Sequence, residues 1–366
     1  MFQLLLESPY TVFKTSLYIS RSCTICGLPK KIIQYINNSF KWTMTKQLDR
    51  TFSIAPMMDW TDKHQRYFAR LLTKRSLLYT EMVTTGAIIY GDEDRHLEYN
   101  EEEHPIALQL GGSDPKDLAK CTKIAKTRAY DEVNLNVGCP SDRVQNNMIG
   151  ACLMGHKDLV ASCISAMRES CDIPVTIKHR IGIDDFDSEE FLSDFVGTVA
   201  ETGCSTFIVH ARIAILDGLS PKENREIPPL KYDWVYRLKQ HFPDLEIIIN
   251  GGIKNLDEAE NHLKNVDGVM LGREAYHNPW LLSEVDQRLY NTPSKVLKRH
   301  EVIEQMYPYI EQQLGHGQKL SYITRHILGL YHAQPGGKQF RRHISEEAHK
   351  LGAGIEVLEK ALSYVK

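Results

Sequence analysis

Short runs of apolar and β-branched residues alternate with longer, helix-sized segments from about residue 52 onward. Eight of these runs predict strands, because each is short and rich in the residues that favour a pleated, buried backbone. The predicted strands are Phe52–Ala55, Leu78–Glu81, Ile106–Leu110, Glu132–Val137, Val175–His179, Thr206–His210, Ile247–Asn250 and Gly268–Leu271. They are mostly spaced by about 22 to 43 residues with helices between, which indicates parallel βα units.

The segment Lys157–Ser170 illustrates the predicted helices, since its apolar residues form one stripe at helical spacing. Eight strands within about 230 residues favour a (β/α)8 TIM barrel over an open, doubly wound sheet. After Pro279 no strand pattern returns, and the chain to Lys366 has the pattern of helices. We therefore expect an α/β barrel over residues 44–294, followed by a smaller all-α helical domain over residues 295–366.

Residues 1–43 differ from the rest, being apolar, aromatic and mildly basic, with Glu7 as their only carboxylate. They lack the order of a secretory signal, although the scarcity of acids leaves a transit peptide as an alternative. We interpret them as an N-terminal extension outside the fold, with Met44 as the natural start. Cys23 and Cys26 form one CxxC there, but no second ligand pair follows at zinc spacing, so we predict no metal site.

Composition adds few constraints to this picture. The 366 residues are 42% hydrophobic and 25% charged, as in an ordinary soluble protein, and no run approaches the ~20 apolar residues of a membrane span. The eight cysteines lack the spacing of a disulfide framework, which suits a reducing cytoplasm. Because the formal charge is only −3, a polyanionic partner would have to meet a local basic patch.

Polar or sulfur-containing residues stand at the carboxyl ends of most predicted strands. In a barrel these ends converge on one mouth, which is where such enzymes keep their active sites. Each residue alone could be explained by packing or solvation, but together they predict an active site. They are Met57 and Met58, Gln109, Asn136 and Cys139, Lys178, His210, Asn250, and Gly272 with Arg273.

Glycine-rich turns follow the last two strands. Asn250, Gly251 and Gly252 follow the seventh strand, and Gly272 with Arg273 follows the eighth. The loops after these strands are the usual phosphate cradle of the fold, because glycines let backbone N–H groups approach an anion. This position suggests a phosphorylated cofactor such as FMN, whereas no GxGxxG indicates Rossmann-type dinucleotide binding.

Cys139 follows the fourth predicted strand and lies between Gly138 and Pro140. Proline keeps the preceding residue out of the helical region, so Cys139 is expected in an extended turn. Taken alone it would be a structural cysteine, but the neighbouring strand ends favour a reactive thiol. Cys152 is the competing thiol, and we expect it to pack on the helix beyond the turn.

Eight motifs occur in the order found in one family of enzymes. They are APMMDWTD (55–62), YTEMVTTGAI (79–88), ALQLGG (107–112), NLNVGCPSDRVQN (134–146), HAR (210–212), LSPKENREIPPL (219–230), INGGI (249–253) and GREAY (272–276). The chain from about Phe52 to its end resembles the tRNA-dihydrouridine synthases, most closely the A subgroup that acts on D-loop uridines 20 and 20a. The resemblance implies an FMN-binding barrel, a helical tRNA-binding domain, and NADPH as the reductant of the flavin.

The resemblance also implies roles for individual residues. Cys139 would be the acid that protonates C5 of the uracil, and Asn136 would hold the base. FMN would be contacted by Pro56, Met57, Met58, Gln109, Lys178, His210, Asn250, Gly251, Gly252, Gly272 and Arg273. The tRNA would be contacted by Glu223, Glu226, Gln339 and Arg342.

Two segments are expected to meet RNA. Ser321–Ser345 contains Arg325, Lys338, Arg341 and Arg342 but no carboxylate, a pattern that by composition alone more often marks a solvated face. The loop 212–230 is long for a βα connection, and long loops there are often functional.

Two alternatives stay open at this point: an FMN-dependent small-molecule oxidoreductase of the dihydroorotate or enoate reductase type, and a non-catalytic tRNA-binding module. The intact Cys139, Lys178 and glycine turns argue against the second. No obligate protein partner is evident from the sequence.

Overall fold

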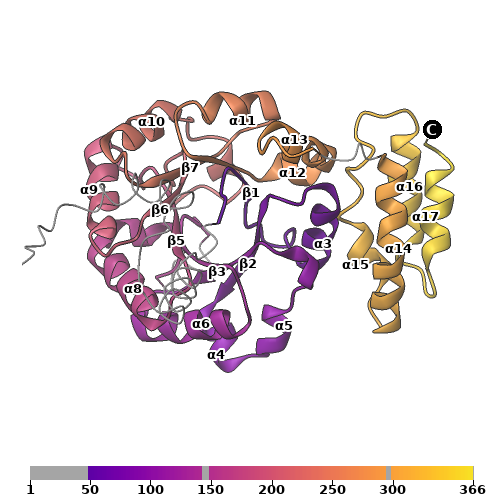
Figure 1. Cartoon of the computed structure of the whole chain (residues 1–366), viewed down its shortest axis with the longest axis horizontal. Helices are drawn as coiled ribbons and strands as arrows, with labels where there is room; N and C mark the ends of the chain where they lie inside the picture. Colours follow the sequence, from indigo (N-terminus) through magenta and orange to yellow (C-terminus); the bar gives the residue numbers. More distant parts are fainter. Residues whose placement is uncertain (1–47, 142–147, 294–297, 366) are drawn as a thin grey trace, which may run out of the picture. The chain divides into compact units, whose positions relative to one another are not determined.

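A computed structural model describes residues 48–141, 148–293 and 298–365. Within them, eight parallel strands close into a barrel in sequence order, with β8 pairing back onto β1 (Figure 1). The strands are β1 Phe52–Ile54, β2 Leu77–Thr84, β3 Ile106–Gly111, β4 Glu132–Val137, β5 Val175–Arg180, β6 Thr206–His210, β7 Glu246–Asn250 and β8 Gly268–Leu271. The predicted (β/α)8 barrel is confirmed.

Several strand ends differ from the prediction by one to three residues. β2 runs to Thr84 rather than Glu81, because a register shift between Tyr79 and Met82 interrupts the alternation that the sequence pattern follows. β5 includes Arg180, which was predicted to lie outside it, and β1 ends one residue earlier than predicted, at Ile54. The extra residue on β5 matters for the site described below.

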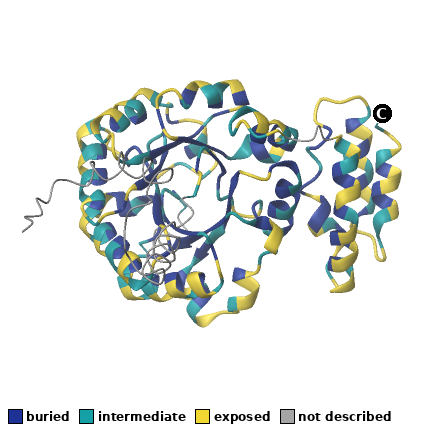
Figure 2. Cartoon of the chain, in the orientation of Figure 1, coloured by how far each residue is buried: buried dark blue, intermediate teal, exposed yellow. Residues whose placement is uncertain are grey.

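Helices cover the outer surface of the barrel (Figure 1). They are α3 Lys63–Leu72, α4 Thr85–Tyr90, α5 Glu93–Leu97, α6 Pro115–Thr127, α8 Lys157–Ser170, α9 Glu189–Ala200, α10 Tyr232–His241, α11 Leu256–His262, α12 Arg273–His277 and α13 Val285–Arg288. The predicted helix Lys157–Ser170 is confirmed as α8, and its Val160, Cys163 and Met167 are buried. Buried residues concentrate on the strands and on the helix faces toward them, whereas the outer helix faces are exposed (Figure 2).

The barrel interior is divided between apolar and polar side chains. A separate apolar cluster, distinct from the core under the helices, includes Ala55, Ile208, Ile248 and Met270. The inward positions of β3, β4 and β5 instead carry buried polar groups, namely Gln109, Glu132, Asn134 and Thr176. A buried polar group must find a partner or lose free energy, so these residues are expected to bond to one another.

The chain after the barrel is helical, as predicted. It forms α14 Arg299–Gly315, α15 Leu320–Thr324, α16 Gly337–Glu347 and α17 Ile355–Leu362. These helices share buried apolar residues with the main core, among them Met306, Phe340 and Leu358. The predicted domain boundary near 294 and the extension 1–43, with Cys23 and Cys26, lie outside the described residues and stay predictions. No helix in the described part of the chain is both long and apolar enough to cross a membrane.

One carboxylate joins the barrel to these helices. Asp62 caps α3 by accepting from the backbone N–H groups of His64 and Gln65, each at 3.0 Å. Its second oxygen accepts from Arg325 at 2.6 Å and from His326 at 3.0 Å, both just after α15. Burial alone would raise the pKa of Asp62, but these donors and the charge of His326 hold it well below its ordinary value.

We expect Asp62→Asn to lower the free energy of unfolding at pH 7 by about 1–3 kcal/mol, because the new amide faces two donors. A carboxylate with a lowered pKa stabilises the fold above its unfolded pKa of about 4 and loses this effect as the pH falls further. The difference between wild type and variant should therefore shrink below about pH 4. Urea unfolding at several pH values measures it.

Asp92→Asn is the control, because Asp92 is an exposed N-cap of α5 that accepts from Arg95 N–H within its own helix. Asparagine is an equally good cap, so this variant should be nearly as stable as wild type. A difference for Asp62→Asn that is the same at pH 3 and pH 7 would contradict the assignment.

Candidate active site

The turn that carries Cys139 is held by hydrogen bonds to its backbone. Asn136 Oδ1 accepts from Gly138 N–H at 3.1 Å and from Cys139 N–H at 3.0 Å. The carbonyl of Cys139 accepts from Ala151 N–H at 2.8 Å. β4 ends at Val137, so this turn presents the half-buried thiol at the carboxyl end of the strand, as predicted. Most of the following polar run, residues 142–147, lies outside the described residues.

Gly150 closes the other side of this turn. Its φ is +89°, and a Cβ there would lie 2.3 Å from the carbonyl oxygen of Cys139. Only glycine allows this conformation and this approach at once. Cys152 follows in the helix expected beyond the turn, which is a short 3-10 helix, η2 Ala151–Gly155, and burial raises the pKa of its thiol. Cys152 is thus a packed neighbour of the turn.

Three cationic or basic side chains stand beside the turn on β5 and β6. Desolvation and the charge of Arg180 lower the pKa of Lys178 to about 7, and desolvation lowers that of Arg180 to about 10. Desolvation and these two cations hold the pKa of His210 well below its ordinary value. Among the described carboxylates, none forms an ion pair with Lys178 or Arg180. A desolvated group of this kind without a counter-ion favours an anionic ligand.

Arg180 is a site residue that the sequence analysis did not identify. Its Nε donates to the carbonyl of Gly138 at 3.1 Å, and its Nη1 donates to the carbonyls of Ile213 and Asn224 at 3.0 and 2.9 Å. It thereby ties the cysteine turn to the long loop after β6. Side chains alternate between the two faces of a strand, so Arg180 shares a face with Thr176 and Lys178 on β5. Extending the predicted strand by one residue would have identified it.

The predicted glycine cradle has the geometry of close approach. Gly251 and Gly252 have φ values of +115° and +73°. A Cβ on Gly251 would lie 2.5 Å from the ring of His210, and Tyr232 holds the Gly251 carbonyl with a 2.6 Å hydrogen bond. Gly272 has a negative φ, so its turn is not left-handed. A Cβ there would make only an ordinary 3.5 Å contact with Met57 Sδ, so close approach is specific to Gly251 and Gly252.

The structure joins a predicted cofactor residue to a predicted RNA residue. Arg273 Nη1 and Glu226 Oε1 form a 2.8 Å ion pair, and Arg273 Nη2 donates to the carbonyl of Arg225 at 3.3 Å. Desolvation and the charge of Arg273 lower the pKa of both Arg212 and Arg225. The loop after β6 therefore adds two positive charges beside the cradle.

The other predicted residues fall into two groups. At the barrel mouth, Pro56 and Met57 are half-buried, Met58 is 56% exposed, and Asn250 Nδ2 donates to the Met270 carbonyl at 2.7 Å. Among the predicted tRNA contacts, Glu223 is exposed on the loop after β6 and accepts from Ser220, while Gln339 and Arg342 lie exposed on α16.

The basic segment contains ion pairs that its composition does not show. Arg325 is paired with Asp62, a partner too distant in sequence for the pattern to show. Arg342 is also ion-paired, with Glu346 at 2.8 Å, one residue beyond the carboxylate-free stretch. No group of three or more metal-binding side chains gathers among the residues that the structure describes.

Comparison with known proteins identifies the family. The dihydrouridine synthase family model matches residues 53–366. The chain belongs to this family. It is 64% identical over 314 residues to a tRNA-dihydrouridine(20/20a) synthase of Vibrio parahaemolyticus, covering 86% of this chain and 96% of the relative. Similar proteins with the same name are 61% identical over 322 residues in Shewanella oneidensis (88% and 96% covered) and 62% identical over 315 residues in Escherichia coli (86% and 95% covered).

Membership of the dihydrouridine synthase family confirms the resemblance drawn from the eight motifs. Enzymes of this family act on uridine in tRNA and are generally flavin-dependent. The match begins at residue 53, so the N-terminal 52 residues lie outside it.

We expect Lys178→Met to stabilise the flavin-free protein, most strongly below pH 7. The folded pKa of Lys178 is about 7 against an ordinary 10.5, so the unfolded chain binds an extra proton between these values. The cost of burying the charge is therefore complete below pH 7 and disappears toward pH 10.5, with a slope of at most about 1.4 kcal/mol per pH unit. Urea unfolding at pH 6, 8 and 10 measures this dependence.

Lys116→Met is the control, because Lys116 is exposed on α6. A gain for Lys178→Met that is equal at pH 6 and pH 10 would show that the lysine is solvated in the fold.

Proposed function

We propose that this protein is an FMN-dependent tRNA-dihydrouridine synthase that reduces the C5=C6 bond of D-loop uridines 20 and 20a, with NADPH as reductant. The observation that carries the proposal is the Cys139 thiol held beside Lys178, a desolvated cation without a described counter-ion. The specificity for positions 20 and 20a rests on the names of relatives that are more than 60% identical over most of their length.

The residues present fit a phosphorylated flavin. The positive-φ backbone at Gly251 and Gly252 would hold the phosphate together with Arg273, which follows the next strand, since the loops after the last two strands form the phosphate cradle of this fold. Lys178, with its uncompensated charge, would stabilise negative charge on the reduced ring. When bound, the flavin supplies the hydride that adds to C6 of the uracil.

Cys139 completes the reaction by donating a proton. Hydride addition at C6 leaves an enolate, whose C5 carbon must be protonated on the enzyme. A thiol is a much stronger acid than the C–H bond that forms, so this transfer is downhill. The bonds to Asn136, Ala151 and Arg180 fix the backbone on both sides of Cys139, which keeps the donor in one place. Asn136 would contact the edge of the base.

A uridine in folded tRNA must leave its stack to reach this thiol, at a cost of a few kcal/mol. We propose that basic residues around the mouth and on α16 offset this cost by contacting phosphates. Arg212 and Arg225 lie in the loop after β6, and Lys338, Arg341 and Arg342 lie within two turns of α16. This division assigns chemistry to a barrel domain over 44–294 and RNA binding to a helical domain over 295–366.

Mass-spectrometric mapping of unmodified tRNA incubated with the protein and NADPH tests the function. We expect dihydrouridine at positions 20 and 20a and a yellow, flavin-containing protein. Reduction of a free pyrimidine or an enoate without reduction of tRNA would overturn the proposal in favour of a small-molecule reductase. A colourless protein that binds tRNA without reducing it would indicate a binding module.

We expect Cys139→Ala to slow tRNA reduction by about 100-fold or more, since a positioned general acid typically contributes 10² to 10⁴. Flavin content and flavin reduction by NADPH should be unchanged, because neither requires the proton donor. Single-turnover mixing of reduced enzyme with tRNA measures the rate. Cys152→Ala is the matched control and should retain activity. Equal rates for Cys139→Ala and wild type would remove Cys139 from the mechanism.

We expect the double change Arg341→Ala and Arg342→Ala to weaken tRNA binding while NADPH oxidation persists. Each lost phosphate contact should also reduce the slope of log affinity against log salt by about one. Glu346→Gln is the counterpart, because it releases Arg342 from its ion pair and should strengthen binding or leave it unchanged. An unaltered affinity of the double variant across a salt series would exclude α16 from the interface.

A further inference from the structure

A chain of hydrogen bonds runs through the polar side of the barrel interior, and its first half starts at Glu132. The hydroxyl of Thr176 donates to Glu132 Oε1 at 2.6 Å, and Asn134 Nδ2 donates to the same hydroxyl at 2.9 Å. Gln109 Nε2 then donates to Asn134 Oδ1 at 2.8 Å. All four residues are at most 1% exposed, so water does not compete for these bonds.

The second half of the chain reaches the catalytic turn. Asn136 Nδ2 donates to Gln109 Oε1 at 2.7 Å. Asn136 Oδ1, at the other end of the same amide, accepts from the backbone N–H of Cys139 at 3.0 Å and of Gly138 at 3.1 Å. Five side chains on β3, β4 and β5 thus connect a carboxylate in the barrel interior to the backbone of the proposed acid.

Every bond in this chain points the same way. Glu132 as a carboxylate only accepts, so Thr176 must give it its single proton and can only accept from Asn134. This leaves the Asn134 oxygen to face Gln109, the Gln109 oxygen to face Asn136, and the Asn136 oxygen to face Cys139. The chain thus runs from obligate donors, the backbone N–H groups of Gly138 and Cys139, to an obligate acceptor, the Glu132 carboxylate, and both ends require the same orientation of each amide.

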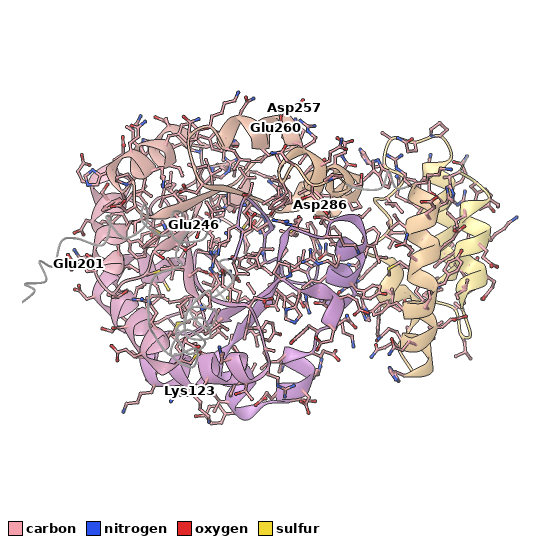
Figure 3. All side chains as sticks on the ribbon, in the orientation of Figure 1. Lys123, Glu201, Glu246, Asp257, Glu260 and Asp286 are labelled. Atoms are coloured by element: carbon pink, nitrogen blue, oxygen red, sulfur yellow. The ribbon has the colours of Figure 1, made fainter. Side chains whose placement is uncertain are left out.

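Glu132 is itself held by charged and polar partners. Arg50 Nε donates to its Oε2 at 2.6 Å, and the hydroxyl of Tyr79 donates to its Oε1 at 2.6 Å. Arg50 also bonds to Glu246 at 3.0 Å, a residue that lies inside the ring of helices, whereas Lys123, Glu201 and Asp257 lie at its rim (Figure 3). The start of the chain is therefore fixed independently of the mouth.

We propose that Glu132, Thr176 and Asn134 are positioning residues for the reaction, and that their hydrogen-bond chain holds Gln109 and Asn136 in place and, through Asn136, the Cys139 turn. This inference rests on the proposed function for the reaction it serves. None of the three residues needs to touch substrate or cofactor. They act through the two amides at the mouth.

The fixed orientation determines what these amides offer a ligand. Asn136 and Gln109 each use one N–H inside the chain, so each has one N–H left. Their oxygens are directed into the chain, toward Cys139 and Asn136 respectively. Asn136 is half-buried, so its remaining N–H can be presented at the mouth, whereas Gln109 is only 1% exposed and supports Asn136 from behind. A donor N–H at this position matches a carbonyl oxygen of a pyrimidine or of an isoalloxazine ring. A flipped amide would present an oxygen to the same atoms and repel them.

The competing interpretation is that these bonds only satisfy a buried carboxylate and stabilise the barrel. Two hydroxyls distinguish the two roles, because Tyr79 and Thr176 donate to the same oxygen of Glu132 at the same distance. Tyr79 is a side branch, whereas Thr176 is a link in the chain. Loss of either hydroxyl removes one donor from Glu132, but only loss of the Thr176 hydroxyl disconnects the amides.

The experiment compares Thr176→Val, Thr176→Ser and Tyr79→Phe in the full-length holoenzyme. Single-turnover reduction of tRNA by reduced enzyme is measured over a range of tRNA concentrations, beside flavin reduction by NADPH. Hydrogen exchange of the peptide that contains Gly138 and Cys139 reports the turn without requiring activity. Denaturant midpoints report the general stability of each variant.

We expect Thr176→Val to lower the maximal rate of tRNA reduction about tenfold or more, because small misplacements of reacting groups cost this much. The tRNA concentration at half-maximal rate should change less than about twofold, and exchange at Gly138 and Cys139 should accelerate. Thr176→Ser keeps the hydroxyl and should stay within about threefold of wild type. Tyr79→Phe should shift the denaturant midpoint without either effect on the turn.

An equal loss of maximal rate in Thr176→Val and Tyr79→Phe would overturn the proposal, because general destabilisation would then explain both. An equal loss in Thr176→Val and Thr176→Ser would also overturn it, because the change in side-chain volume would then explain both. An unchanged rate and exchange in Thr176→Val would also overturn it. If Thr176→Val does not fold, Asn134→Leu interrupts the next link at similar volume and is judged by the same outcomes. If wild type does not reduce tRNA, the proposed function fails, whereas the exchange comparison still decides whether the chain holds the turn.

Discussion

A buried carboxylate determines how much of this barrel is arranged. Glu132 is fully buried, and an ionised group there is tolerated only with several donors around it. Arg50 reaches it from just before β1, Tyr79 from β2 and Thr176 from β5, while Glu132 itself opens β4. One residue thus requires four parts of the barrel wall to converge. Because removal of any partner would leave a buried charge undersatisfied, the requirement fixes the register of these strands as well as their proximity.

At the mouth of the barrel, by contrast, buried charges lack partners of opposite sign among the described residues. There Lys178 and Arg180 are desolvated on β5 and no described carboxylate pairs with them, and Arg212 and Arg225 add charge nearby. The compensated charges around Glu132 hold parts of the barrel together, while the cations near Cys139 without a described counter-ion suit an anionic ligand. The ligands that we propose for this site, namely a flavin phosphate, a reduced flavin ring and a tRNA backbone, are all anionic. The free-energy cost of burying unpaired cations therefore falls at the mouth, where an anionic ligand can offset it.

The sequence was sufficient for the fold and for most of the mouth. Strand and helix periodicities are local, so eight strands could be recognised, and the barrel rule then placed Cys139, Lys178 and His210 together. The interior chain could not be predicted, because Glu132 and Thr176 are 44 residues apart and neither belongs to a recognisable motif. The ion pair of Arg325 could not be predicted for the same reason, since its partner Asp62 is 263 residues away. Contacts between distant segments decide whether a polar residue is free, and composition does not report them.

The residue types on β4 nevertheless match the donor-to-acceptor direction of the hydrogen bonds in this chain. The inward positions 132, 134 and 136 read Glu, Asn, Asn, which places one group that only accepts below two that both donate and accept. An aspartate at 136 could still accept from Cys139 N–H but could not donate to Gln109, so two oxygens would face each other. A glutamate at 109 would face Asn134 in the same way. In this protein, the carboxylate and two carboxamides at alternate positions of β4, linked through Thr176 and Gln109 on the neighbouring strands, thus form a directed hydrogen-bond chain that ends at the Cys139 turn.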